Sequence, residues 1–239
     1  MTTTTAPLTE NRFVSGEYVR AARDLPVEGR AIVVNTGTRP AWTSLEPRRP
    51  LPAFSSTILV DTTVSWAESL VVLKVDDEAG PTAEIVDEPE WVRLGDVVGE
   101  HIGPGTPFPV DTPLWKGPQD VLDVVEFDPG QALGGGPSGP RAFELRANLW
   151  FAPAGTDCGI HVLHDFIEVH TQVVGVGRMQ KFRDQDHATL VEDVVMGEGY
   201  TTPVPFCGRT DEGGFVYPWH QYRADTDCVW LALEYHQLP

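Results

Sequence analysis

The sequence predicts an all-β protein, and three observations carry this prediction. Gly (23 residues) and Pro (21 residues) are spread along the chain and divide it into short pieces. Most pieces are rich in Val, Ile, Leu, Trp and Thr, which is typical of strands that end at turn residues. No long segment repeats its apolar residues with the 3.6-residue period of a helix. A sandwich or a barrel is therefore expected.

Individual strands are predicted where an apolar run is bounded by turn residues. The stretch from Phe143 to Phe151 alternates apolar and polar residues cleanly, so it is expected to be a half-buried strand. A brief helix is expected around Glu17–Arg23. The other expected strands are Ala31–Asn35, Thr57–Val64, Ser69–Val75, Trp91–Val98 and Val121–Phe127.

The composition excludes several classes of partner. The chain of 239 residues has 17 Lys and Arg against 35 Asp and Glu, a formal net charge of −18. A surface that acidic repels phosphate backbones and anionic lipid, so no nucleic acid and no membrane is expected as a partner. The three cysteines, Cys158, Cys207 and Cys228, form no dense framework, which indicates a reducing compartment. The start of the chain does not resemble a signal peptide, and a cytoplasmic protein is expected.

Four parts are expected along the chain. Residues 1–15 are Thr-rich and are predicted to form a disordered tail. Residues 16–127 form a β-rich N-terminal part, either as extra strands that cover a barrel or as a degenerate second module. Residues 128–141, with three consecutive glycines, form a Gly/Pro-rich loop. Residues 142–239 contain the candidate site.

The candidate site is predicted from a cluster of histidines, six of which lie between His161 and His236. If the chain from His164 to Gln172 is a strand, its alternate residues put imidazole, carboxylate and amide groups on one face. That face is either exposed to solvent or lines a barrel interior, where its burial requires mutual hydrogen bonds or a metal. Imidazole and carboxylate are ligands of divalent first-row metals, so a metal site is predicted, with His220 as its second half.

The spacing in the first segment resembles the first motif of the cupin superfamily. That motif is a Gly, then His-x-His, three or four residues, a Glu, six residues and a Gly. His164, Glu168 and Gly175 match its second half. Val162 stands at the place of the first His of the motif, and His161, one position away, would need a β-bulge to reach inward.

The downstream segment resembles the second cupin motif, Pro-x-Gly-x-x-His-x-x-x-Asn. His220 takes the place of the histidine and is preceded by Pro218. The Gly of the motif is missing, and Ala224 stands at the place of the Asn. The two matches together extend over Phe151 to Leu233, and they specify a fold more closely than a reaction.

The resemblance implies a jelly-roll β-barrel that binds one divalent transition metal. His164, Glu168 and His220 are the implied ligands, with His161 as the fourth and His170 as a reserve. Fe(II) is the favoured metal, and Mn(II), Ni(II) and Zn(II) are alternatives. By analogy with cupins, a homodimer is expected.

Three residues are expected beside the metal as catalytic groups. His170 and Gln172 would orient substrate or move a proton, and Tyr222 would form a wall of the pocket. The implied function is a mononuclear metal-dependent enzyme acting on a small polar metabolite, with oxygenase-type chemistry favoured. A redox-neutral isomerase, lyase or cyclase, a non-catalytic binding protein and a metal-free barrel are the alternatives.

Overall fold

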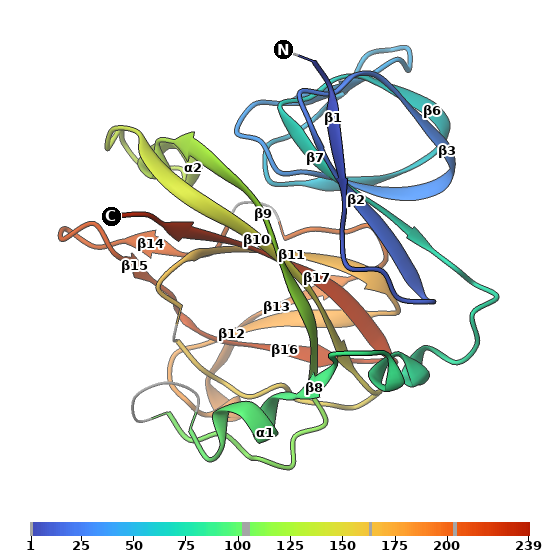
Figure 1. The fold of residues 1–239 in the computed structure, drawn as a ribbon. Coiled ribbons are helices and arrows are strands. Elements are labelled where there is room, and N and C mark those ends of the chain that lie inside the picture. The colour runs from blue at the N-terminus through green and yellow to red at the C-terminus, as the bar shows by residue number, and fades with distance from the viewer. Residues whose placement is uncertain (1, 102–105, 163, 203–204) are drawn as a thin grey trace.

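The computed structural model describes residues 2–101, 106–162, 164–202 and 205–239 (Figure 1). Strands account for 52% of the chain and helices for 8%, and every strand pair is antiparallel. The predicted all-β class is therefore confirmed. In the part of the chain that the structure describes, no helix is long and apolar enough to cross a membrane.

The first third of the chain forms a seven-stranded sheet with the order β1-β2-β7-β3-β6-β4-β5. Its strands are β1 (Thr4–Pro7), β2 (Val14–Arg20), β3 (Arg23–Asn35), β4 (Ala41–Thr43), β5 (Pro50–Leu51), β6 (Ser56–Trp66) and β7 (Ser69–Val75). Three of the predicted strands lie within β3, β6 and β7. The two alternatives for this part, extra strands that cover a barrel or a degenerate second module, stay predictions.

The rest of the chain forms a five-stranded sheet, β11-β17-β10-β9-β8, a three-stranded sheet, β13-β12-β16, and the small pair β14-β15. The strands are β8 (Val92–Arg93), β9 (Trp115–Phe127), β10 (Arg141–Ala152), β11 (Ile167–Val174), β12 (Gly177–Phe182), β13 (Leu190–Met196), β14 (Gly208–Arg209), β15 (Phe215–Val216), β16 (Trp219–Ala224) and β17 (Cys228–Gln237). The short helices are η1 (Thr82–Asp87), α1 (Leu94–Val98), α2 (Pro129–Ala132) and η2 (His187–Thr189).

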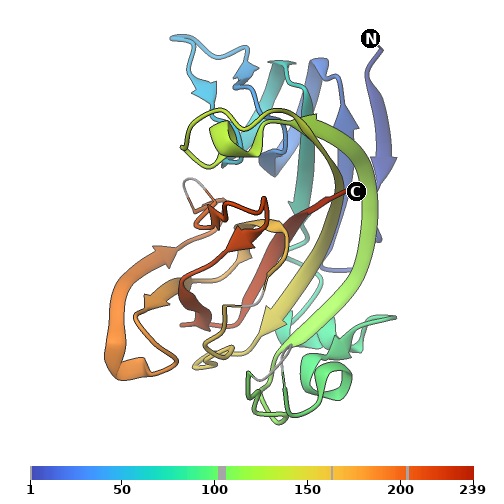
Figure 2. The same cartoon turned by 90° about the vertical axis from the view of Figure 1, so that its left-hand side faces the viewer.

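The five-stranded sheet is the middle layer, with the N-terminal sheet on one side and the three-stranded sheet on the other (Figure 2). Toward the N-terminal sheet, Leu231 packs in one apolar cluster with Ile32 and Val71. Toward the three-stranded sheet, Trp230 packs in a second cluster with Met179. Because both of its faces are covered, β17 is buried along nearly its whole length.

This layering explains where the strand β10 differs from its prediction. Phe143, Leu145 and Phe151 are buried on the predicted apolar face. The opposite face was expected to be exposed, but Asn148 on it is only 3% exposed. The prediction of a half-buried strand is wrong at this point, because alternation within one strand does not reveal that a second layer covers the polar face.

Two predicted elements adopt another secondary structure. Glu17–Arg23 was expected to contain a brief helix, but residues up to Arg20 belong to β2, which pairs with β1 and β7. Pairing with two neighbours overrides a weak local preference. Trp91–Val98 was expected to be a strand, but only β8 is extended and α1 follows it. A short apolar run does not distinguish a strand from a buried helix.

The predicted disordered tail of residues 1–15 is ordered where the structure describes it, and only Met1 lies outside the described residues. β1 pairs with β2 over four residues. Thr9 donates from its backbone N and from Oγ1 to the Asp120 carboxylate, at 2.9 and 2.7 Å. The Thr-rich composition is thus compatible with a strand once a partner strand supplies the hydrogen bonds.

The Gly/Pro-rich segment 128–141 is organised around one carboxylate. Asp128 caps α2, where Pro129 occupies the first helical position. Its oxygens also accept from Ser138 Oγ at 2.7 Å and from the backbone N of Gly139 at 2.9 Å. These hydrogen bonds, led by the one from Ser138, hold the pKa of the Asp128 carboxyl well below its ordinary value.

Replacing Asp128 with alanine is expected to loosen this segment without unfolding the protein. The backbone N–H groups of Ser138 and Gly139 would lose the carboxylate that accepts from both of them. Amide hydrogen exchange at Ser138 and Gly139 should become faster, while the exposed Asp211→Ala control leaves it unchanged. The contribution of a carboxyl with a lowered pKa is complete above its ordinary pKa of about 3.9 and is lost as the pH falls further. Unchanged exchange in Asp128→Ala would contradict this role.

Candidate metal centre

Three imidazole rings converge in the interior between the five-stranded sheet and the three-stranded sheet. His164 Nε2 lies 3.0 Å from His161 Nε2 and 3.1 Å from His220 Nε2. One ligating atom from each ring lies within 4.8 Å of the other two. Adjacent ligands of an octahedral ion are roughly 3 Å apart when each bond is about 2.1 Å, so the two distances from His164 Nε2 match those between neighbouring ligands of such an ion.

His161 and His220 reach this point because they lie directly opposite each other. The backbone N of His161 donates to His220 O, and the backbone N of His220 donates to His161 O, both at 2.9 Å. Residues opposed across an antiparallel pair point to the same face. The chain before His161 already runs beside β16, where Cys158 N donates to Tyr222 O and Asp157 lies opposite Arg223. Four residue steps lead from Asp157 to His161 but only three from Arg223 to His220, so one extra residue lies on the His161 side and the expected β-bulge is confirmed.

His164 approaches from a loop rather than from a strand. β11 begins at Ile167, so the expectation that the strand includes His164 is wrong, although the alternation from Glu168 to Gln172 is confirmed. Ile167, Val169 and Val173 pack toward the N-terminal sheet, while Glu168 and His170 line the interior cavity.

Two of the rings are held with Nε2 free to bind. His161 Nδ1 donates to Gly159 O and His220 Nδ1 donates to Pro218 O, each at 2.9 Å. Since a carbonyl only accepts, the proton sits on Nδ1 and the Nε2 lone pair faces the other rings. Burial lowers the pKa of His161 to about 4 and holds the pKa of His220 well below its ordinary value. Neutral imidazole is the form that binds a metal.

Glu168 lies at the side of the three rings and joins them to His170. Its Oε2 is 3.6 Å from His164 Nε2, and its Oε1 is 3.0 Å from His170 Nε2. Burial alone would raise the pKa of this carboxyl, but His170 and His164 together lower it below its ordinary value. Both ring nitrogens of His170 are buried without a hydrogen bond among the described residues, and Nε2 has only its close contact with Glu168 Oε1. The centre thus contains an ionised carboxylate and one unused imidazole nitrogen.

Tyr217 positions Glu168 at the start of β11. Its hydroxyl accepts from the backbone N of Glu168 at 2.9 Å and donates to Phe166 O at 2.8 Å. Tyr217→Phe leaves both buried backbone groups without that partner, so the free energy of unfolding is expected to fall by about 1–3 kcal/mol. Urea denaturation measures this loss. The control Tyr200→Phe, at a side chain that is 37% exposed, should change it little, and equal effects would refute the assignment.

A cavity of about 80 Å³ adjoins the rings. His170 and Tyr222 line it, as expected for groups beside a metal. Gln172 does not line it, and its expected role next to the substrate is not supported by its position. Its Oε1 accepts from Tyr222 and its Nε2 donates to Val174 O at 2.8 Å, so both ends of its amide are occupied. Gln172 therefore orients Tyr222.

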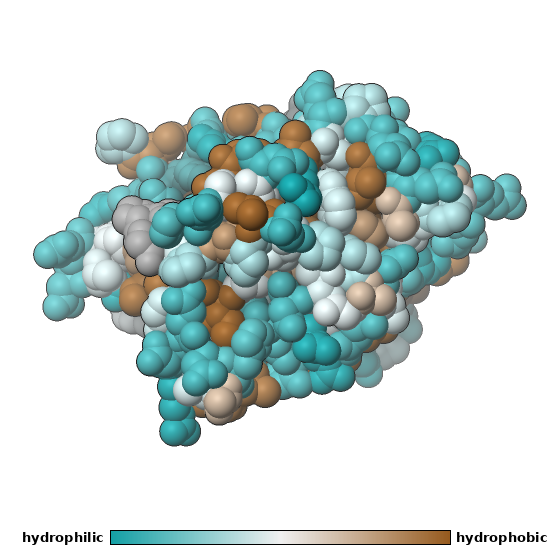
Figure 3. Space-filling view, turned by 90° about the horizontal axis from the view of Figure 1, so that it is seen from below, coloured by the Kyte–Doolittle hydropathy of each residue, from teal (hydrophilic) through white to brown (hydrophobic). Residues whose placement is uncertain are grey.

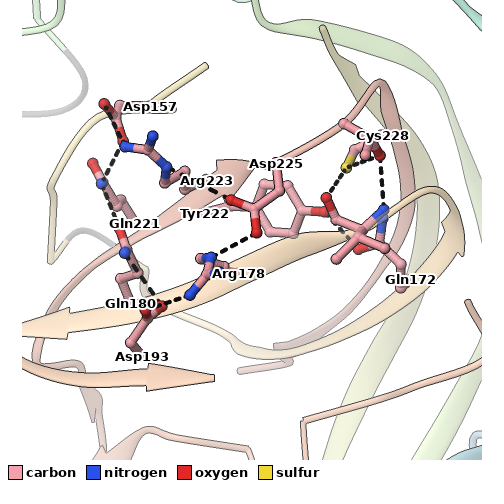
Figure 4. A network of polar contacts seen from close by, with 12 residues as sticks. Asp157, Gln172, Arg178, Gln180, Asp193, Gln221, Tyr222, Arg223, Asp225 and Cys228 are labelled. Atoms are coloured by element: carbon pink, nitrogen blue, oxygen red, sulfur yellow. Dashed lines mark hydrogen bonds and ion pairs between the residues drawn. The ribbon is translucent and has the colours of Figure 1, made fainter. Parts of the chain in front are cut away.

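A polar network on the outer face of the three-stranded sheet holds the strand that carries His220 (Figure 4). Arg178 on β12 donates to Asp193 on β13 at 2.7 Å and to Asp225 at 2.6 Å. Gln221, next to His220, donates to Gln180 Oε1 at 2.8 Å. These contacts connect all three strands, so they fix the register of β16 from the side opposite the rings.

Several residues near the centre were not found from the sequence. Leu94 and Leu114 line the cavity from the segment around α1, which was assigned to the N-terminal part. Glu234 is 5% exposed and lies directly across from Glu168 in the β11–β17 pair. Glu234 could have been found from the sequence, because it stands between the apolar residues Leu233 and Tyr235. Glu168 stands between apolar neighbours in the same way.

No protein-family model and no functionally curated protein matches the chain. Among solved structures, a cupin 2 barrel protein from Leptotrichia buccalis is similar over 98% of this chain and 89% of its own, at 9% identity and a TM-score of 0.29. An oxalate decarboxylase variant from Bacillus subtilis matches over 95% and 70%, at 11% identity and a TM-score of 0.30.

A ribosomal oxygenase from Escherichia coli matches over 41% of this chain, at 19% identity and a TM-score of 0.29. The matched part is 24% of that protein, so the chain spans about a quarter of its length. The solved structures that the chain resembles include members of the cupin family, and they define no subfamily.

Proposed function

We propose that this chain is a metal-dependent enzyme of the cupin type, acting on a small molecule in the cavity beside the three rings. This proposal rests on the convergence of three imidazole Nε2 atoms. His164 Nε2 lies 3.0 Å from His161 Nε2 and 3.1 Å from His220 Nε2. Three neutral nitrogens brought together in an interior, with two tautomers set by backbone carbonyls, are an arrangement that a divalent ion stabilises.

His161, His164 and His220 would hold the metal, and Glu168 would be the fourth ligand after a small movement or a hydrogen-bond acceptor beside it. A bound metal supplies a Lewis acid or, for Fe(II), redox chemistry. Proton transfer would be carried out by a different residue from those that hold the metal. His170 lines the cavity, and its Nδ1 has no hydrogen bond to the described residues, so it would hold or move a substrate proton.

Oxygenase-type chemistry is our first choice, because three nitrogens and one carboxylate leave coordination positions open on Fe(II). A redox-neutral isomerase or lyase is the second candidate, and the unused nitrogen of His170 favours it. Oxygen consumption during turnover of a candidate substrate separates the two. The homodimer expected from analogy stays a prediction.

Metal analysis of protein purified without a histidine tag tests the proposal directly. About one equivalent of a first-row transition metal per chain is expected, since the three rings form one centre. Titration of the metal-free protein with Co(II) should give visible bands of nitrogen-ligated metal. Absence of any stoichiometric metal in both experiments would exclude a metal enzyme and leave a metal-free barrel.

A further inference from the structure

The cavity beside the rings has two chemically different sides. One side consists of the three rings with Glu168 and His170, and the other is apolar. Leu94 and Leu114 belong to the apolar side, and they are 8% and 4% exposed. Leu94 N donates to Leu114 O at 2.8 Å, so the two side chains belong to one wall. Trp150 and Trp230 also belong to that side, with their rings nearly parallel and their centroids 6.3 Å apart. Cys158 and Tyr222 are the remaining residues of the described lining.

In the described part of the chain, the lining of this cavity has no basic group other than its histidines. Its described lining contains neither Lys nor Arg, and Lys116, which reaches the ring of Trp150, is not part of the lining. Residues 1, 102–105, 163 and 203–204, which the structure does not describe, include no Lys or Arg in the sequence. A metal held by the three rings would supply the positive charge that balances one anionic head group. A second charged group would be buried against the apolar side without a counter-charge, which is strongly unfavourable.

The size of the cavity limits the ligand as well. About 80 Å³ is available, and one water-sized position needs about 10–15 Å³. A ligand of roughly five to eight non-hydrogen atoms is therefore expected. The surface around this end of the molecule is mostly hydrophilic, with separate hydrophobic patches (Figure 3). The apolar side of the cavity is thus a feature of the interior rather than part of a large apolar surface.

We infer that the cavity takes a small molecule with a single oxygen head group and an uncharged, apolar body. The head group lies toward His161, His164 and His220, and the body lies against Leu94, Leu114 and the two tryptophans. The inference rests on the proposed metal centre for the head group only. It narrows the small polar metabolite expected from the sequence, because only one end of the ligand is polar.

Ligand binding tests this without knowledge of the substrate. Butanoate, with one carboxylate, should bind to Zn(II)-loaded protein at least about tenfold more tightly than succinate, which adds a second charge at similar length. Calorimetry or ligand-observed NMR measures both affinities. Pentan-1-ol, with no charge, should bind to the metal-free protein as well, since the apolar side needs no metal. Equal or tighter binding of succinate would overturn the inference.

The outcomes separate this inference from the proposed function. Failure of Zn(II) to bind, with pentan-1-ol still bound, would refute the metal centre and retain the apolar pocket. Binding of Zn(II) without binding of butanoate or pentan-1-ol would retain the metal centre and refute the pocket.

Variants of the wall identify the place of binding. Leu94→Ala and Leu114→Ala should each shift the preference from butanoate toward hexanoate, by roughly tenfold for two additional buried methylene groups. Leu51→Ala is the matched control, because Leu51 is also 8% exposed but belongs to a separate apolar cluster of the N-terminal sheet. An equal shift in the control, or none in either wall variant, would show that the body lies elsewhere.

Discussion

The His164→Ala variant is expected to lose tight metal binding while it keeps its fold. His164 is the central ring, with Nε2 within about 3 Å of both other nitrogens, so its removal leaves two ligands and an open side. Removal of groups that only support a ligand costs 10–100-fold in affinity, so loss of the central ligand should weaken binding by at least about a hundredfold. Co(II) titration of the metal-free variant measures this loss.

The fold should survive because His164 lies in a loop, and the polar contacts found for its side chain go to other residues of the centre. The side chain is also 14% exposed, so alanine leaves a gap that water can enter. His187→Ala, in the exposed η2 turn, is the control and should bind metal as the unchanged protein does. If His164→Ala keeps full affinity, the three rings do not form the metal site.

The Gly175→Ala variant is expected to show the largest loss of stability. Gly175 joins β11 to β12 with a φ of +79°, a conformation that costs a residue with a Cβ atom about 1–3 kcal/mol. A Cβ there would also lie 2.1 Å from the backbone oxygen of Asp227, which cannot move away as a flexible side chain could. Strain and overpacking together predict a decrease of about 4 kcal/mol in the free energy of unfolding.

Thermal unfolding should therefore shift down by about 10 °C in Gly175→Ala, at roughly 2–4 °C per kcal/mol for a chain of this size. Gly197→Ala is the matched control, since its Cβ would meet no atom within 4 Å and its φ is not positive. A loss no larger in Gly175→Ala than in Gly197→Ala would show that the turn can rearrange.

Much of the candidate site follows from local pattern. The alternation along β11 correctly predicted which side chains share a face, because that depends only on the two-residue repeat of an extended chain. The pairing of this segment with His220 was predicted from spacing, and the structure brings the rings together. Local pattern did not determine whether His161 reaches the centre, because this depends on its pairing with His220, 59 positions later.

Alternation in β10 and β11, and the residue types on their faces, were thus determined by the sequence itself. Only the tertiary structure decided that His161 opposes His220, that Gln172 is bound to Tyr222, and that Leu94 and Leu114 cover the cavity. The physical reason is the separation along the chain of the residues that make each contact. The direction of a side chain along a strand is a local property, whereas strand partners, layers and cavity walls depend on contacts between residues far apart in the chain.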